Sequence, residues 1–378
     1  MDIAQYQYDH GQWLPSLPHG NRSQLVLAFG SRAAMLEEAM AADLSDAFNQ
    51  ADIVGCTTSG EIFGDEVYDD TLVLTAIDFS NTQVRVVSEN CNKHCDSSAV
   101  AKALAQQLPS ENLRAVLVIS DGQLVNGSEL VAGLKQQLPA SVLFSGGLAG
   151  DDDRFAETVV WHNQKIESGL VVLCGFYGDD LIIGHGSLGG WTTFGPDREI
   201  TRADKNVLYE LDGQPALDLY KRYLGDVAAQ LPGAALRFPL NLTLPNEQES
   251  VVRTILSINE DEKSMVFAGN MPKGAKVQLM KASFDALIDG ANAAAEFACT
   301  GLREQRPQLA LLISCVGRRL VLGQRVFEEL ESVHDVIGDN CVMCGFYSYG
   351  EISPVVSSTE CKLHNQTMTI TAFSERKH

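Results

Sequence analysis

The stretch that indicates the fold runs RAVLVIS (114–120), DGQLVNGSELVAGLKQQLPA (121–140) and SVLFSGG (141–147). The two outer segments are short apolar runs, which are typical of buried strands. The middle segment has a helical pattern near 128–137. A strand, a helix and a second strand in this order predict a βαβ-type unit.

Two further parts of the chain repeat this pattern. QLVLAFG (24–30) and DIVGC (52–56) flank one helical pattern, and QLALLIS (308–314) and VMCGFYS (342–348) flank another. TLVLTAIDF and TQVRVVS alternate like the strands of a hairpin, with Asn81 at the turn. The sequence therefore predicts a mixed α/β fold with βαβ-type units and mixed sheets.

The domain organisation follows from where these patterns begin and stop. Residues 1–22 are polar and aromatic, which predicts an irregular arm. The glycine-rich GGWTTFGPDREIT (189–201) predicts a boundary between α/β domains at 23–195 and 196–378. GCTTSGEI (55–62) and CGFYSYGEI (344–352) resemble one another, which either a related construction of the two domains or chance would explain.

Composition excludes several classes of function. With 28 Lys and Arg against 49 Asp and Glu, the net charge is −21, which opposes binding to nucleic acid or anionic membranes. The sequence contains no 18-residue apolar run and does not begin like a signal peptide, so we expect neither membrane insertion nor export. Nine cysteines, several within apolar runs, favour reduced thiols and a cytoplasmic location.

The common catalytic and metal-binding patterns are weak in this chain. Cys91, His94 and Cys95 resemble half a zinc site, but a structural zinc needs four ligands, and Cys341 and Cys344 could supply the others only if the fold brought them together. The acidic run Asp151–Asp153 could hold Mg²⁺, but consecutive side chains point in different directions, which favours a solvated acidic turn. Cys315 near Arg318 has no base beside it in sequence. A hydrolase or transferase that uses Cys315 or the acidic run is therefore a minor hypothesis.

One histidine has neighbours of the kind that an apolar cofactor requires. His185 lies between Gly184 and Gly186, and Trp191 and Phe194 follow shortly after. A flat macrocycle needs an imidazole, backbone without side chains, and aromatic walls. The alternative is a histidine that is hydrogen-bonded within a glycine turn.

Several strings together resemble the FIST family (F-box and intracellular signal transduction). GCTTSGEI (55–62), FSGGLAGDD (144–152) and ELDGQPALDLY (210–220) resemble its amino-terminal half. The strings that resemble the carboxyl-terminal half are SCVGRR (314–319), GFYSYGEISP (345–354) and LHNQT (363–367). The resemblance extends from about residue 25 to residue 373 and implies a non-enzymatic sensory protein that binds a small ligand.

Within that family, GHGSLGGWTTFGP (184–196) looks like the NosP branch of nitric-oxide sensors. This likeness implies haem b as cofactor, nitric oxide as ligand and a partner histidine kinase in cyclic-di-GMP and biofilm signalling. His185 would be the axial iron ligand, with Gly184, Gly186, Trp191 and Phe194 around the haem. His162 or His364 would be a second ligand.

The alternative is a haem-free FIST sensor of a small polar ligand such as an amino acid. Its site would bring together polar residues of the two similar motifs and of the carboxyl-terminal half: Ser59, Glu61, Arg318, Tyr347, Ser348, Glu351 and Asn365.

Overall fold

Three sheets of the same design form the larger part of the molecule. A computed structural model describes residues 1–376 except 153, 155, 246–249, 304 and 355–359. In each sheet two neighbouring strands are parallel, an antiparallel pair extends one side, and a hairpin extends the other. The predicted mixed α/β fold with mixed sheets is confirmed.

The first sheet has the order β12-β11-β4-β3-β7-β1-β2, with β3 parallel to β4. Its strands are β1 (Asp2–Asp9), β2 (Gln12–Leu14), β3 (Leu25–Gly30), β4 (Asp52–Thr57), β7 (Leu72–Asp78), β11 (Val160–His162) and β12 (Lys165–Glu167).

The second sheet has the order β26-β25-β10-β9-β13-β8, with β9 parallel to β10. Its strands are β8 (Gln83–Asn90), β9 (Leu113–Ser120), β10 (Leu143–Leu148), β13 (Leu170–Tyr177), β25 (Gly350–Pro354) and β26 (Cys361–His364).

The third sheet has the order β14-β27-β23-β24-β5-β6, with β23 parallel to β24. Its strands are β5 (Glu61–Phe63), β6 (Glu66–Tyr68), β14 (Leu181–Leu188), β23 (Leu309–Cys315), β24 (Val342–Ser348) and β27 (Met368–Glu375).

The hairpins are exchanged in a cycle. The chain leaves β4 of the first sheet to form the β5–β6 hairpin of the third, and leaves β24 of the third to form β25–β26 of the second. It leaves β10 of the second sheet to form β11–β12 of the first. The three sheets are therefore interlocked, with a pseudo-threefold arrangement, and none is built from one continuous segment.

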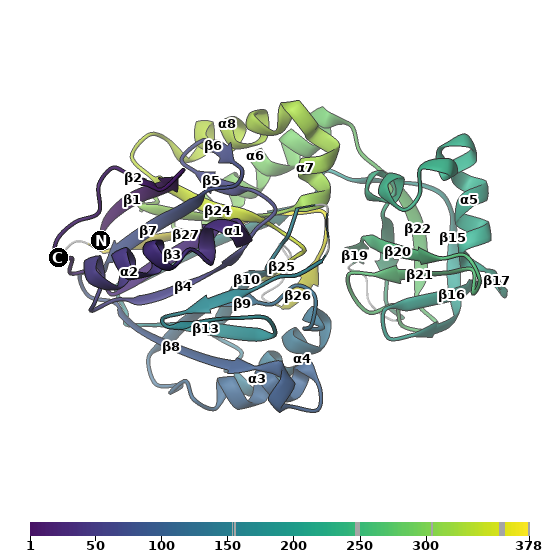
Figure 1. Cartoon of the computed structure of the whole chain (residues 1–378). Helices are drawn as coiled ribbons and strands as arrows, with labels where there is room; N and C mark the ends of the chain where they lie inside the picture. The colour runs from purple at the N-terminus through teal and green to yellow at the C-terminus, as the bar shows by residue number, and fades with distance from the viewer. Residues whose placement is uncertain (153, 155, 246–249, 304, 355–359, 377–378) are drawn as a thin grey trace.

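The helices cover the outer faces of the sheets (Figure 1). Buried apolar residues join α1 (Arg32–Met35) and α2 (Glu38–Ala47) to the first sheet, α3 (Ser97–Ala105) and α4 (Gly127–Gln137) to the second, and α6 (Phe284–Gly301) and α8 (Val326–Ile337) to the third. A central core, which includes Leu27, Leu117 and Leu311, lies where the inner faces of the three sheets meet.

A smaller unit, here called the inserted domain (192–281), is placed to one side of the three-sheet body in Figure 1. Its sheet has the order β19-β18-β22-β15-β16-β21-β20, and it has its own apolar core. Its strands are β15 (Thr192–Asp204), β16 (Val207–Leu211), β17 (Gln214–Pro215), β18 (Leu240–Thr243), β19 (Ser250–Arg253), β20 (Ile255–Asn259), β21 (Ser264–Phe267) and β22 (Lys276–Lys281). Its helix is α5 (Ala216–Leu224), with 3₁₀ turns at Gly225–Gln230 and Gly233–Arg237.

Three expectations need correction. Residues 1–22 are no irregular arm, because β1 pairs with β7 along Asp2–Tyr8. The strands on either side of Asn81 do not form a hairpin, because β7 belongs to the first sheet and β8 to the second. The division at 195/196 lies near the start of the inserted domain, but the chain returns to the three-sheet body at α6, so 196–378 is not one spatial unit.

Candidate functional site

The exchanged strands cross at the centre of the three-sheet body. There, the Ser59 amide donates to the Tyr347 carbonyl (2.8 Å), the Tyr349 amide to the Leu148 carbonyl (3.2 Å), and the Gly150 amide to Thr57 (2.9 Å). Each bond joins two different sheets. This ring of backbone bonds holds the crossing segments in place.

Two buried glutamates occupy matching places beside this ring. Glu61 accepts hydrogen bonds from the Thr58 hydroxyl (2.5 Å) and the Thr71 hydroxyl (3.0 Å). Glu351 accepts from the Ser348 hydroxyl (2.8 Å) and the Thr367 hydroxyl (2.9 Å). Burial raises the pKa of each carboxyl to about 8, against the opposing effect of these bonds.

In the second sheet an aspartate, Asp121, makes the equivalent hydrogen bond to the residue before a strand. The Asp121 carboxylate accepts from the Gly169 amide (3.0 Å), just before β13, as Glu61 and Glu351 bond the residues just before β7 and β27. The similarity of GCTTSGEI and CGFYSYGEI thus corresponds to equivalent positions in the first and third sheets. The repeat has three members, and the second has diverged in sequence.

The residues predicted to bind a small polar ligand do gather near this centre, but they are buried and bonded to the chain itself. Ser59, Tyr347 and Ser348 are fully buried, as are Glu61 and Glu351. Their polar atoms are therefore engaged within the protein in this structure.

Arg318 is also committed to the protein. Its guanidinium donates to Glu329 (2.8 Å from Nε to Oε1) and to the carbonyls of Gly189 and Leu287. Tyr347 adds a hydrogen bond to Glu329 (2.8 Å). This is a buried ion pair whose charges are satisfied internally, so Arg318 is not available to a ligand.

Asn365 differs from this group. Its Nδ2 approaches the Tyr349 carbonyl at 3.5 Å, whereas its buried Oδ1 has no hydrogen-bond partner among the described residues.

The residues predicted to hold haem do not form a slot. A Cβ on Gly184 would lie 1.9 Å from the Ala298 carbonyl oxygen, and one on Gly186 would lie 2.0 Å from that of Ala294. These glycines therefore let α6 pack against β14, so a macrocycle could not approach the strand at Gly184 and Gly186.

The other members of the predicted haem site point elsewhere. His185 alternates with the two glycines, so it faces away from α6, beside Thr371, whose hydroxyl bonds Ser145 of the second sheet (2.8 Å). Trp191 donates to the Gln366 carbonyl (2.8 Å), and Phe194 belongs to β15 of the inserted domain. The residues present do not fit a haem in this arrangement.

The two other histidines lie apart from His185. His162 Nδ1 is 2.7 Å from the Ser88 hydroxyl, and its Nε2 is 3.7 Å from Asp52. His364 is buried beside the Ser353 carbonyl (3.2 Å), and burial lowers its pKa to about 4. Neither is brought to His185 as a second ligand.

The remaining chemical motifs are also accounted for. Within the described residues, no three His, Cys, Asp or Glu side chains are grouped as metal ligands. Asp151 pairs with Arg154 (2.7 Å), whereas Asp153 lies outside the described residues. Burial raises the pKa of the Cys315 thiol, which opposes formation of the thiolate.

No helix in the described ranges is long and apolar enough to cross a bilayer.

Cavities lie along the junction between the three-sheet body and the inserted domain. One of about 230 Å³ lies between the segment 122–127 that follows β9, Tyr349, and Phe267–Gly269 of the inserted domain. Another, of about 530 Å³, lies between Phe284, Leu320 and the turn at Gly233–Arg237.

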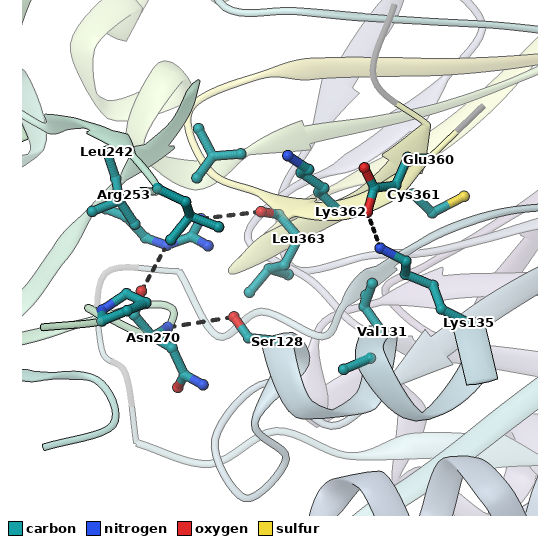
Figure 2. A pocket seen from close by; sticks show the side chains of 14 residues that line it. Ser128, Val131, Lys135, Leu242, Arg253, Asn270, Glu360, Cys361, Lys362 and Leu363 are labelled. Carbon is teal, nitrogen blue, oxygen red and sulfur yellow. Dashed lines mark hydrogen bonds and ion pairs between the residues drawn. The ribbon is translucent and has the colours of Figure 1, made fainter. Parts of the chain in front are cut away.

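A third junction cavity, of about 210 Å³, has a buried cation in its wall (Figure 2). We call it the Arg253 cavity. One wall comes from α4 and β26 of the three-sheet body, and the other comes from the inserted domain. The lining residues of the body are Ser128, Val131, Ala132, Lys135, Glu360, Cys361, Lys362 and Leu363. Those of the inserted domain are Leu242, Leu244, Val251, Arg253, Asn270 and Pro272.

Sequence reasoning missed this place. Arg253 stands in VVRTIL, an alternating strand with no motif around it, and its partners are more than a hundred residues away in the body. A single charged residue within an apolar strand was the only available signal.

Two known proteins are similar to this chain, one in sequence and one weakly in structure. An uncharacterized protein of Methanocaldococcus jannaschii is 24% identical over 362 residues, and the match covers 83% of this chain and 66%, slightly less than two thirds, of the archaeal protein. The solved cyanuric acid hydrolase of A. caulinodans matches with 10% identity and a TM-score of 0.19 over 78% of this chain and 100% of its own, a likeness that supports no conclusion.

The models of the FIST N domain and the FIST C domain match consecutive parts of the chain, residues 24–214 and 216–354. The first match alone covers half of the chain. In the structure both parts contribute strands to the second and third sheets. The chain therefore belongs to the FIST family, whose domains are sensory domains of signal transduction.

Proposed function

We propose that this protein is a cytoplasmic, non-enzymatic sensor that binds a small polar ligand, of the size of an amino acid, at the junction between the three-sheet body and the inserted domain. The observation that carries the proposal is the Arg253 cavity, whose wall is built from both parts and contains a buried cation. Small-molecule sites typically occur between domains, where an apolar cavity has a few converging polar groups.

A ligand at this junction has a direct route to a signal. Because it contacts both parts, it favours the arrangement in which both walls reach it, and so shifts the population of relative domain positions. The surface that changes would then be read by a second protein, for which a histidine kinase is our proposal.

Haem-based nitric-oxide sensing through His185 is the other candidate. Partial burial lowers the pKa of His185, which favours the neutral imidazole that metals bind. Against it, α6 occupies the side of β14 where Gly184 and Gly186 lie. Iron ligation by His185, and signalling to cyclic-di-GMP pathways and biofilm formation, stay predictions.

The test is a thermal unfolding screen against the twenty amino acids, with hemin and hemin plus nitric oxide as separate arms. We expect an amino acid at about 100 times its dissociation constant to raise the melting temperature of this 378-residue chain by about 3 °C. A hemin Soret band that His185→Ala removes and the exposed control His10→Ala keeps would replace this proposal with the haem sensor.

A further inference from the structure

We propose that Arg253 is the carboxylate-binding residue of this protein, and that the ligand's apolar remainder fills the Arg253 cavity. The inference rests on the proposed function, since it names the chemical class that the junction takes up. It goes further by assigning the contact to one side chain that no sequence motif marks.

The hydrogen bonds of Arg253 leave its charge uncompensated. Nη1 donates to the carbonyls of Leu363 (3.0 Å) and Val252 (3.1 Å), and Nε lies 3.4 Å from the Asn270 carbonyl (Figure 2). Among the described residues, no carboxylate pairs with Arg253 and no group accepts a hydrogen bond from its Nη2.

This is an unusual state for a guanidinium that is only 7% exposed. Burial lowers the pKa of Arg253 to about 10, so the group stays protonated at neutral pH. A buried charge is costly unless an opposite charge is close. Arg318, the comparable buried arginine, has Glu329 as partner, and for Arg253 that place is open to a ligand.

The local backbone positions the guanidinium at the cavity. A Cβ on Gly269 would lie 2.9 Å from Arg253 Nε and 3.0 Å from its Cζ, so a larger residue here would displace the guanidinium from this position. The first turn of α4 supplies Ser128, whose hydroxyl accepts from the Asn270 amide (3.3 Å).

The rest of the wall favours an apolar group on the ligand. Besides Arg253 the lining is mostly aliphatic, with Val131, Leu242, Val251 and Leu363 among its members. Lys135 is engaged by Glu360, as Figure 2 shows. An apolar cavity of about 150 Å³ holds benzene, so about 210 Å³ accommodates a branched aliphatic carboxylate.

The experiment compares 4-methylpentanoate with its uncharged isostere, 4-methylpentanamide, by calorimetric titration of the full chain. We expect the acid to bind and the amide to bind at least tenfold more weakly. Arg253→Met should weaken the acid at least tenfold, because a charge-assisted hydrogen bond is lost. Arg253→Lys should give an intermediate loss, since it keeps the charge but not the planar fork.

Two further variants guard against misfolding and non-specific charge effects. Gly269→Ala keeps the arginine but displaces its guanidinium, so it should weaken the acid as Arg253→Met does. Arg202→Met is the matched control, because Arg202 lies on the surface of the same domain and pairs with Glu210 (2.9 Å). It should leave binding unchanged.

The outcomes separate this inference from the proposed function. Equal affinity for acid and amide, or unchanged binding of the acid to Arg253→Met, would overturn the role of Arg253. Amino acids that bind wild type and Arg253→Met alike would overturn it while leaving the sensor standing. If neither the amino acids nor the acid bound wild type, both would fall.

Discussion

Glu61 and Glu351 show how one side chain can stabilise a crossing between sheets. Each carboxyl bonds a hydroxyl three residues earlier and a threonine just before the next strand of the sheet that the chain rejoins. The bonds therefore join the two ends of each exchanged hairpin. Their role is structural, although the sequence motifs around them suggested a ligand site.

The pH dependence of stability should reveal these two groups. Their folded pKa of about 8 is above the usual 4.5, so the folded state retains protons that the unfolded state loses. The stabilisation is complete below about pH 4.5 and is lost as the pH rises to about 8, by up to about 1.4 kcal/mol per pH unit for each glutamate.

Urea unfolding of wild type and Glu61→Gln from pH 5 to 8 tests this prediction. The free energy of unfolding should fall less steeply in Glu61→Gln, because glutamine has no proton to lose. Glu111→Gln, at an exposed position, should follow wild type. Parallel curves for wild type and Glu61→Gln would show that Glu61 is already ionised at pH 5.

The contact between β14 and α6 explains the glycine pattern that suggested a cofactor. Gly184 and Gly186 lie on the face of β14 toward the helix, against the carbonyls of Ala298 and Ala294. Small residues on both elements allow this close approach. A G-x-G pattern in a strand can therefore mark helix packing as readily as a ligand.

Gly186→Ala should consequently destabilise the whole protein. The new methyl group would lie 2.0 Å from the Ala294 carbonyl, and the helix backbone cannot yield without loss of packing, so we expect a cost of about 3 kcal/mol. Gly233→Ala is the control, since an added Cβ there meets nothing within 4 Å. Equal melting temperatures for the two variants would contradict this packing role.

The exchange of hairpins makes the three-sheet body a single cooperative unit. The third sheet needs β5, β6 and β14 from before the inserted domain and β23, β24 and β27 from after it. Glu375 reinforces the joint by accepting bonds from the Ser80 and Thr82 amides and pairing with the amino terminus. The inserted domain, by contrast, has its own sheet and core.

The two parts of the molecule should therefore differ in whether they fold when expressed alone. Residues 192–281 alone should unfold cooperatively on heating, because their core is complete. Residues 1–191 alone should lack a cooperative transition, because the third sheet would lose its central strands. Circular dichroism melting of both fragments tests this, and a stable, monomeric 1–191 would refute the interlocked body.

The sequence by itself determined the mixed α/β class, the strand–helix–strand units and the family, because apolar periodicity and short motifs act over a few neighbouring residues. Only the tertiary structure decided that three sheets exchange hairpins, that the Ser-(x)-Gly-Glu motifs tie crossings, and that Arg253 lines a cavity. The exchanged strands and the Arg253 cavity join segments more than a hundred residues apart, and their energies come from burial and pairing across the fold. The apolar periodicity of one segment does not predict which distant segment that segment will pair with.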